Sequence, residues 1–202
     1  MLLTLIFIGA CAVEYVPKRA VWAHMSTVDE VRLEKDIPFA RMGDALFLAF
    51  IHIESDGDPA AHRPRSQYYG LLQMGTAAST DVGVVNKDNL VPLTAVSSFV
   101  DYMHLYKKYH GWSPSRMAVC WKGGPGTCKK LGELTRKGVS LDAAILQLER
   151  ANPKLGRLAE YVRRFRVAHS NYTNWLDEGN SPYQTESLIG KVAMWFKRGA
   201  QS

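Results

Sequence analysis

The chain has 202 residues, of which 47% are hydrophobic and 22% are charged, a balance typical of one globular domain of ordinary size. It contains no internal repeat and no low-complexity tract, which excludes repeat architectures and compositionally biased chains. Its 25 Lys and Arg against 19 Asp and Glu give a net charge of +6. That charge favours an anionic partner, such as a cell-wall polymer, a membrane surface or nucleic acid, without choosing among them.

The first apolar segment covers residues 2–13, LLTLIFIGACAV, and is too short to span a bilayer, which needs about 20 apolar residues in a helix. It resembles the core of a signal peptide, and the sequence IGAC at residues 8–11 resembles a bacterial lipoprotein cleavage box. However, no Lys or Arg precedes the apolar run. A buried or partner-bound N-terminal segment is the other interpretation.

The mixed, charged residues 17–35 predict a helix or an arm that leads into the domain. Asp36 followed by Pro38 is a helix start signal, and we expect a helix from there to Glu54. Residues 56–59, DGDP, then end it, because Gly and Pro continue a helix only at a cost in free energy. One face of this helix carries apolar residues at spacings of three and four: Phe39, Met42, Leu46, Phe50 and Ile53.

Glu54 lies four residues after Phe50 and three after Ile51, so it prolongs the apolar stripe of this helix. A carboxyl group with apolar neighbours pays a desolvation cost when charged, which raises its pKa and lets it hold a proton near neutral pH. Such a group can serve as a general acid. The alternative is a solvated glutamate at a frayed helix end.

Residues 68–74 predict a short extended element or hairpin. Beyond it, capping residues, Pro and Gly signals and apolar periodicity predict helices at residues 92–110, 113–121, 126–137 and 140–151. Pro153 opens a further helix, whose apolar positions are Leu155, Leu158, Tyr161, Val162 and Phe165.

The C-terminal part of the chain divides into two segments. Residues 170–184 are polar and are expected to be irregular. Residues 185–198 predict an amphipathic helix with Leu188, Val192 and Trp195 on its apolar face. That face either docks on the chain's own domain or binds a membrane or a partner protein.

The three cysteines, Cys11, Cys120 and Cys128, form neither a metal-binding spacing nor a disulfide framework. Cys120 and Cys128 flank a Gly-rich loop and could bridge it in an oxidising compartment, but we expect free, partly buried thiols. The six histidines show no ligand spacing such as His-Glu-x-x-His, so we expect neither a metal nor a cofactor.

Four short motifs follow one another between residues 47 and 165. They are Glu54-Ser55 followed by Pro59-Ala60, GLLQM at residues 70–74, CWKGGPG at residues 120–126, and Tyr161-Val162. In this order they resemble the motifs of the soluble lytic transglycosylase family, which has a lysozyme-like fold and cuts bacterial peptidoglycan. The family usually reads Gly-Leu-Met-Gln and an aliphatic residue at the second motif, and Ala-Tyr-Asn-Ala-Gly-Pro-Gly at the third.

This resemblance implies a mainly α, lysozyme-like (α+β) catalytic domain at residues 36–169, with a small extended element near the active site. Residues 1–35 would form an N-terminal apolar segment and arm. Residues 170–202 would form a linker and a C-terminal amphipathic helix.

Most glycosidases use two carboxylates, but the sequence places no second one with Glu54. Asp56 and Asp58 lie too close in the chain, on the turn that ends the helix, and Asp81 and Asp101 are separated from the motifs. The resemblance implies that Glu54 alone cleaves the β-1,4 bond between N-acetylmuramic acid and N-acetylglucosamine. The product would be a 1,6-anhydro-muramyl sugar, with no water consumed.

The resemblance also implies supporting roles around the glycan. Gln73 would hydrogen-bond an N-acetyl or hydroxyl group, Tyr161 would orient Glu54 or the sugar, and aromatic faces would line the groove. Ser55 would fix the helix end, a structural role as much as a functional one. The alternatives are core packing and hydrogen bonding to the backbone. The expected substrate-binding residues are Gln73, Tyr161, Ser55, Met74, Trp121, Lys122 and Tyr69.

The chain departs from the family pattern at two places. The family's Tyr-Asn pair is Trp121-Lys122 here, so a side-chain amide has become a cation, although Trp121 can still stack on a pyranose ring. The acidic residue that often precedes the closing Tyr by four positions is Arg157 here. Cations rather than a second carboxylate are therefore expected near Glu54, and a nearby cation would lower its pKa against the effect of desolvation.

Two other functions stay open. A water-using muramidase of related fold would need a second carboxylate, and a non-catalytic glycan-binding component of a phage particle or secretion machine would accommodate Lys122 and Arg157. The basic residues are dispersed and no nucleic-acid recognition motif is present, so no nucleic-acid partner is expected. We expect peptidoglycan strands as the partner, with phage, secretion-apparatus or membrane contacts through the two apolar ends. The expected location is the periplasm or cell wall, for a virion-associated or exported protein.

Overall fold

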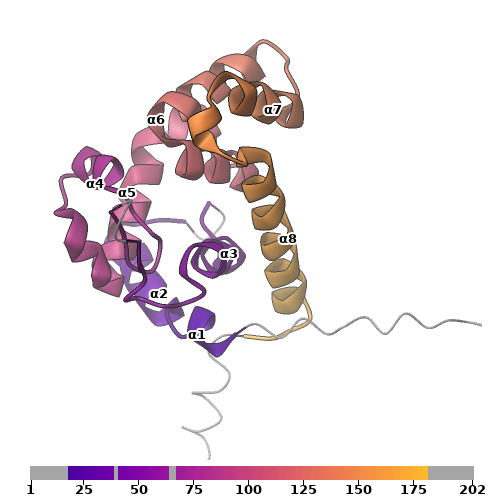
Figure 1. Cartoon of the computed structure of the whole chain (residues 1–202). Helices are drawn as coiled ribbons and strands as arrows, with labels where there is room; N and C mark the ends of the chain where they lie inside the picture. Colours follow the sequence, from indigo (N-terminus) through magenta and orange to yellow (C-terminus); the bar gives the residue numbers. More distant parts are fainter. Residues whose placement is uncertain (1–17, 39–40, 64–66, 182–202) are drawn as a thin grey trace, which may run out of the picture.

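The computed structural model describes residues 18–38, 41–63 and 67–181, and this part of the chain is mainly helical, as predicted. The segments at residues 2–13 and 185–198 lie outside the described residues. None of the described helices is long and apolar enough to cross a membrane. The elements in chain order are α1 (Arg19–Trp22), α2 (Met25–Glu34), α3 (Asp44–Ser55), β1 (His62–Arg63), β2 (Tyr68–Tyr69), α4 (Thr76–Asp81), η1 (Asn86–Leu90), α5 (Pro92–His110), α6 (Pro114–Arg136), α7 (Leu141–Ala151), η2 (Pro153–Leu155) and α8 (Leu158–Asp177) (Figure 1).

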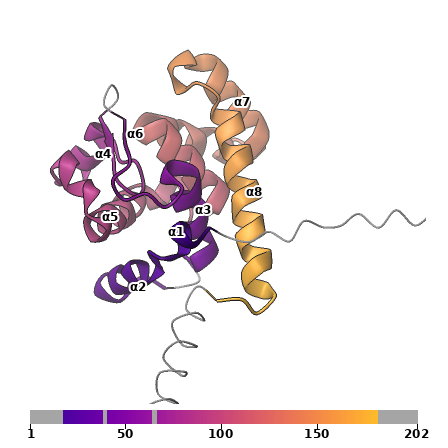
Figure 2. The same ribbon diagram turned by 60° about the horizontal axis from the view of Figure 1, so that its bottom comes forward.

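Helix α3 lies in the middle of the fold, and α8 runs alongside it (Figures 1 and 2). Its position follows from its composition, because all side chains of residues 46–51 are buried and such a helix must be covered on every side. The ring of Phe50 contacts rings from three other helices. The centroid separations are 4.9 Å to Phe99 of α5, 6.4 Å to Trp121 of α6 and 4.6 Å to Phe165 of α8.

The start of α3 differs from the prediction, because the helix begins at Asp44 and not at Asp36. Asp36 has a φ of 49°, which is incompatible with a right-handed helix. The true first turn is held by Arg32 of α2, whose Nη1 lies 2.7 Å from Asp44 Oδ1 and whose Nε donates to the Met42 carbonyl. The prediction at Asp36 relied on a local start signal. The true start depends on this buried ion pair, which is a tertiary contact and cannot be read from neighbouring residues.

The end of α3 agrees with the predicted stop at residues 56–59. The last helical residue is Ser55, and Asp56 and Gly57 then have φ values of 57° and 87°. A Cβ at position 57 would lie 2.3 Å from the Ala20 carbonyl carbon, so only glycine lets the chain pass this close to α1. The α3 C-terminus is thereby fixed in place.

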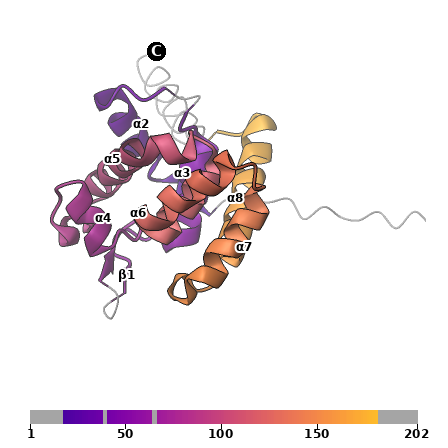
Figure 3. The ribbon, with the colours of Figure 1, turned by 90° about the horizontal axis from the view of Figure 1, so that it is seen from above.

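The two helices predicted at residues 113–121 and 126–137 are the two halves of α6, which bends at Gly124. Gly124 has a φ of 73° and a ψ of −175°, a conformation that favours glycine, and Pro125 follows it. Figure 3 shows α6 lying between α5 and α7. Helix α7 begins as predicted, with the Ser140 hydroxyl accepting a hydrogen bond from the Ala143 amide.

The irregular segment predicted at residues 170–184 is wrong up to Asp177, because α8 continues to that residue. The domain boundary predicted at residue 169 therefore falls inside a helix. Ala168 and Tyr172 continue the buried stripe of α8 at a spacing of four, although polar residues surround them in the sequence. At its start, the helix predicted from Pro153 is divided into η2 and α8.

A short antiparallel hairpin lies next to the end of α3. His62 of β1 pairs with Tyr69 of β2, and Arg63 pairs with Tyr68. Tyr69 also forms a bridge with Met74, so the extended element predicted at residues 68–74 is present. Strand β1, which the sequence did not predict, completes it.

Candidate active site

Two clefts meet at Glu54 in the last turn of α3. Cleft A, of about 490 Å³, extends from Glu54 between Tyr68 of β2, the bend of α6 and Leu155 of η2. Cleft B, of about 520 Å³, extends from Glu54 past the turn at residues 56–58 towards Arg164 of α8. Glu54, Arg63 and Gln73 line both clefts, so together they form one groove that passes the Glu54 carboxyl.

The carboxyl group of Glu54 accepts a hydrogen bond at Oε1 from the Tyr161 hydroxyl of α8. Burial raises the pKa of Glu54, and this effect exceeds the lowering by the Tyr161 hydrogen bond and by the Lys122 and Arg63 cations. A hydrogen bond from Trp121 lowers it least. From the sequence, desolvation was expected to raise the pKa of Glu54 and nearby cations to lower it. In the structure the effect of desolvation is the larger one.

The Tyr161 hydroxyl stays protonated, because burial and then the neighbouring Glu54 raise its pKa well above the usual range. It therefore donates to Glu54 Oε1 rather than competing with Glu54 as the acid of the site. Lys122 lies over the ring of Tyr161, with its Nζ 5.6 Å from the ring centroid. The structure thus brings together three of the predicted site residues, Glu54, Lys122 and Tyr161. Glu54 and Tyr161 are 107 positions apart in the chain.

The predicted aromatic lining is partly correct. Trp121 lines cleft A, but Met74 is 1% exposed and belongs to the core. Tyr69 does not line cleft A and stacks on His62 instead, with centroids 4.4 Å apart. Its neighbour Tyr68 lines cleft A, because successive side chains of a strand point to opposite faces.

Gln73 lines both clefts through a side chain that is largely fixed by the backbone. Its Nε2 donates to the carbonyls of Ala61 at 2.9 Å and Gly70 at 3.0 Å. Both amide hydrogens are therefore used, and Oε1 is the atom left to accept a hydrogen bond from a ligand. The structure thus shows the structural role that the sequence left open, and the binding role of Gln73 stays a prediction.

Ser55 joins the end of α3 to the GLLQM segment. Its hydroxyl donates to the Leu71 carbonyl at 2.7 Å and accepts from the Gly57 amide at 3.2 Å. The hydroxyl is thus engaged with the backbone, although the residue lines cleft B. Its position gives Ser55 a structural role in holding Glu54 near Gln73.

We expect Ser55→Ala to lower the free energy of unfolding by roughly 1 to 2 kcal/mol, because the Leu71 carbonyl loses its buried donor. Urea titration followed by circular dichroism measures this change. Ser26→Ala, at an exposed position of α2, is the matched control and should unfold like the wild type. Equal midpoints for the two variants would contradict this role.

Glu54 is the one acidic residue among the described residues that line cleft A. Asp56 and Asp58 lie in cleft B, where Asp56 pairs with Lys18. Further away, Asp101 pairs with Lys35 at 2.8 Å and Asp81 accepts from the Tyr106 hydroxyl. The described side chains therefore offer cleft A a single carboxyl group.

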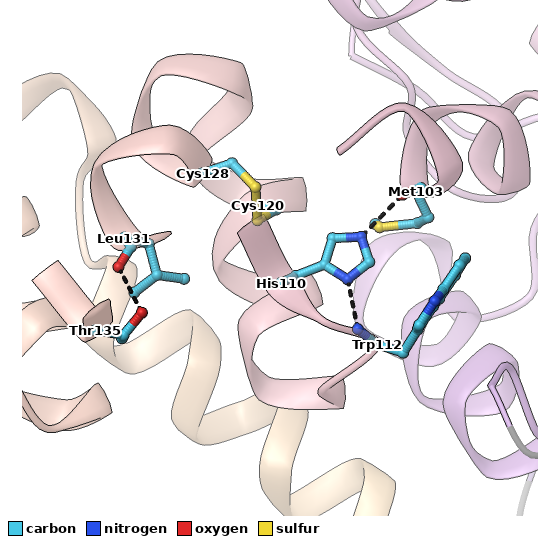
Figure 4. The surroundings of a disulfide bond; sticks show 7 residues. All are labelled: Met103, His110, Trp112, Cys120, Cys128, Leu131 and Thr135. Atoms are coloured by element: carbon cyan, nitrogen blue, oxygen red, sulfur yellow. Dashed lines mark hydrogen bonds between the residues drawn. A yellow bond between two sulfur atoms is a disulfide. The ribbon is translucent and has the colours of Figure 1, made fainter. Parts of the chain in front are cut away.

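Cys120 and Cys128 form a disulfide bond, which corrects the expectation of free thiols. The bend at Gly124 turns α6 so that the two Cα atoms lie 4.4 Å apart. Both cysteines are fully buried beside His110 (Figure 4). The bond closes the loop that carries Trp121 and Lys122, so it fastens one wall of cleft A.

The described residues contain no group of three or more His, Cys, Asp or Glu side chains that could hold a metal ion. Sequence reasoning missed Arg63, Tyr68 and Lys154, all of which line cleft A. A two-residue strand leaves no periodic signal, so nothing in the sequence pointed to Arg63. Arg157, which was expected near Glu54, lines a separate groove with Glu149.

No protein-family model matches this sequence, and a comparison with curated proteins finds no match. The function is therefore inferred from the side chains of the groove and their geometry.

Proposed function

We propose that this chain is a peptidoglycan lytic transglycosylase with a lysozyme-like catalytic domain. It cleaves the β-1,4 bond between N-acetylmuramic acid and N-acetylglucosamine and forms a 1,6-anhydro-muramyl product. The observation that carries the proposal is the Glu54 carboxyl, the one carboxyl group among the described residues that line cleft A, held by Tyr161 and with its pKa raised by burial.

In the first step, protonated Glu54 donates its proton to the glycosidic oxygen. A general acid works best when its pKa lies near the working pH, and burial moves the pKa of Glu54 in that direction. The N-acetyl group of the substrate stabilises the positive charge that develops at the anomeric carbon. Trp121 offers a ring face to the sugar, and Gln73 offers Oε1 to an N-acetyl N–H.

In the second step, the Glu54 carboxylate accepts the proton of the muramyl 6-hydroxyl, whose oxygen attacks the anomeric carbon. The first step leaves Glu54 in the ionised form that the second step requires, so one group serves both. Lys122 and Arg63 stabilise that carboxylate, and Tyr161 keeps donating to Oε1. No step needs a second carboxylate or a water molecule.

The disulfide bond fits a protein that works in an oxidising compartment such as the periplasm. A setting in a phage particle or a secretion apparatus, where a glycan strand must be opened locally, is compatible with this location. Water-using cleavage would need a second carboxylate to activate water, and the described lining of the groove offers only Asp56 and Asp58, which lie in cleft B on the turn directly after α3, with Asp56 paired to Lys18.

The test is digestion of purified peptidoglycan followed by mass analysis of the soluble products. We expect muropeptides that are lighter by one water than the hydrolytic products and that lack a reducible end. Hydrated, reducible products would identify a muramidase instead. Binding without any release of soluble sugar would support the non-catalytic alternative.

We expect Lys122→Met to move the alkaline limb of the pH profile of kcat/KM to higher pH. The Lys122 cation lowers the pKa of Glu54, so its removal raises that pKa and keeps the acid protonated further up the pH scale. Lys129→Met, on an exposed position of α6, is the matched control. An unmoved limb, or one moved to lower pH, would show that Lys122 does not act on the catalytic acid.

A further inference from the structure

Cleft A is lined by three cationic side chains from three different elements: Arg63 of β1, Lys122 of α6 and Lys154 of η2. One carboxyl group, that of Glu54, faces them among the described lining residues. Cleft A is therefore positively charged, even when Glu54 is ionised. A neutral glycan backbone alone does not require this charge.

The two lysines of cleft A are not among the cations that form ion pairs with described carboxylates. Elsewhere Lys35 pairs with Asp101 at 2.8 Å, and Arg166 pairs with Asp142 at 2.7 Å. Among the described residues, neither Lys122 nor Lys154 has a carboxylate within ion-pair distance. Both ammonium groups are exposed to the cleft and can meet a charge brought by the ligand.

Two of the three cations also act on Glu54, but Lys154 has another position. Lys122 and Arg63 are among the largest electrostatic influences on the Glu54 carboxyl, and Lys154 is not. Lys154 lies on η2 and lines cleft A beside Leu155. The positive charge of Lys154 is therefore better placed to bind a ligand in cleft A than to change the pKa of Glu54.

We propose that cleft A binds the carboxylates of the peptide substituents that peptidoglycan strands carry, with Lys154 as the specificity-determining cation. The site then prefers strands whose peptides have free carboxylates over strands whose peptides are amidated. This inference rests on the proposed function for its class of substrate. The glycan lies past Glu54, and its lactyl-linked peptide lies along cleft A towards η2.

The experiment uses the full chain with Glu54→Gln, so that binding is measured without cleavage. Isothermal titration compares two tetrasaccharide peptides that differ only in carrying free carboxylates or carboxamides. We expect roughly fivefold to tenfold tighter binding of the free carboxylates at low salt, and a smaller ratio as salt screens the lysines. Lys154→Gln should reduce the ratio towards one, whereas Lys129→Gln should leave it unchanged.

Equal affinities for the two ligands overturn the inference, as does a preference that Lys154→Gln leaves intact or a failure to bind either ligand. Thermal unfolding of the Lys154→Gln protein verifies that it is folded. The proposed reaction is tested separately, by the anhydro product of the wild type. A preference for carboxylates without that product would reject the reaction and retain the site, and the reverse result would retain the reaction alone.

Discussion

Glu54→Gln is expected to reduce the release of soluble muropeptides from purified peptidoglycan by about 10³-fold or more. General acid or base catalysis by one positioned group contributes roughly 10² to 10⁴-fold, and here the same carboxyl group serves both steps. Glutamine keeps the size of the side chain and an oxygen that can accept from Tyr161, but it neither gives nor takes the proton. Release rates of the two proteins measure the loss.

The same substitution should leave the fold intact, which separates chemistry from stability. Burial raises the pKa of Glu54 above its unfolded value, so its ionisation opposes folding. The stability that this group contributes is present below the unfolded pKa and is lost as pH rises through the folded pKa. Glutamine has no charge to bury, so its melting temperature at pH 7 should equal or exceed that of the wild type, with the gain shrinking in acid.

Glu34→Gln is the matched control, because Glu34 is exposed on α2 and lines neither cleft. It should keep wild-type release rates. A Glu54→Gln protein that still clears cell walls would reject the single-acid scheme, as would equal losses in the two variants.

The central helix and its end were predictable, because both depend on local sequence. The apolar face of α3 and the turn at residues 56–59 are both recognisable in the sequence, whereas the burial of every side chain of residues 46–51 was seen only in the structure. The beginning of α3 was not, since it depends on the buried contact between Arg32 and Asp44, two residues 12 positions apart. The end of α8 was missed because its last turns carry few apolar residues. Tyr172 is one of the few that mark the buried side of the helix there.

The site residues that belong to a sequence motif were predictable, and those that reach the site only through the three-dimensional fold were not. Glu54, Trp121 and Lys122 lie together as the motifs implied, and Tyr161 reaches them from α8. The choice of Tyr69 was wrong by one residue, and one residue along a strand reverses the direction of the side chain. Whether burial or the nearby cations would dominate the pKa of Glu54 could be decided only from distances in the three-dimensional structure.

The disulfide was ambiguous in the sequence, because a separation of eight residues fits both a bridge and two thiols. In a straight helix, eight residues would place the two cysteines about 12 Å apart, too far for a bond. The bend at Gly124 brings the two cysteines close enough to bond. The Gly-rich segment thus shapes the wall of cleft A and brings the two cysteines together.

The double variant Cys120→Ala and Cys128→Ala is expected to lose about 2.5 kcal/mol of unfolding free energy, from the chain entropy that closing a loop of this length removes. For a chain of this size that corresponds to a fall in melting temperature of roughly 5 to 10 °C. Activity should fall as well, because the loop carries Trp121 and Lys122, which line cleft A. Calorimetry and muropeptide release measure the two effects.

Reduction of the wild type under mild denaturation should reproduce the behaviour of the double variant, since either treatment opens the same loop. The same reductant should leave the melting temperature of the double variant unchanged, which makes that protein its own control. Cys120 and Cys128 are fully buried, so the folded wild type should resist reductant that is added without denaturant. If alkylation and mass analysis of the oxidised protein find both thiols free, the wall of cleft A is held by packing alone, and the loss of stability in the double variant should shrink to that of two small cavities.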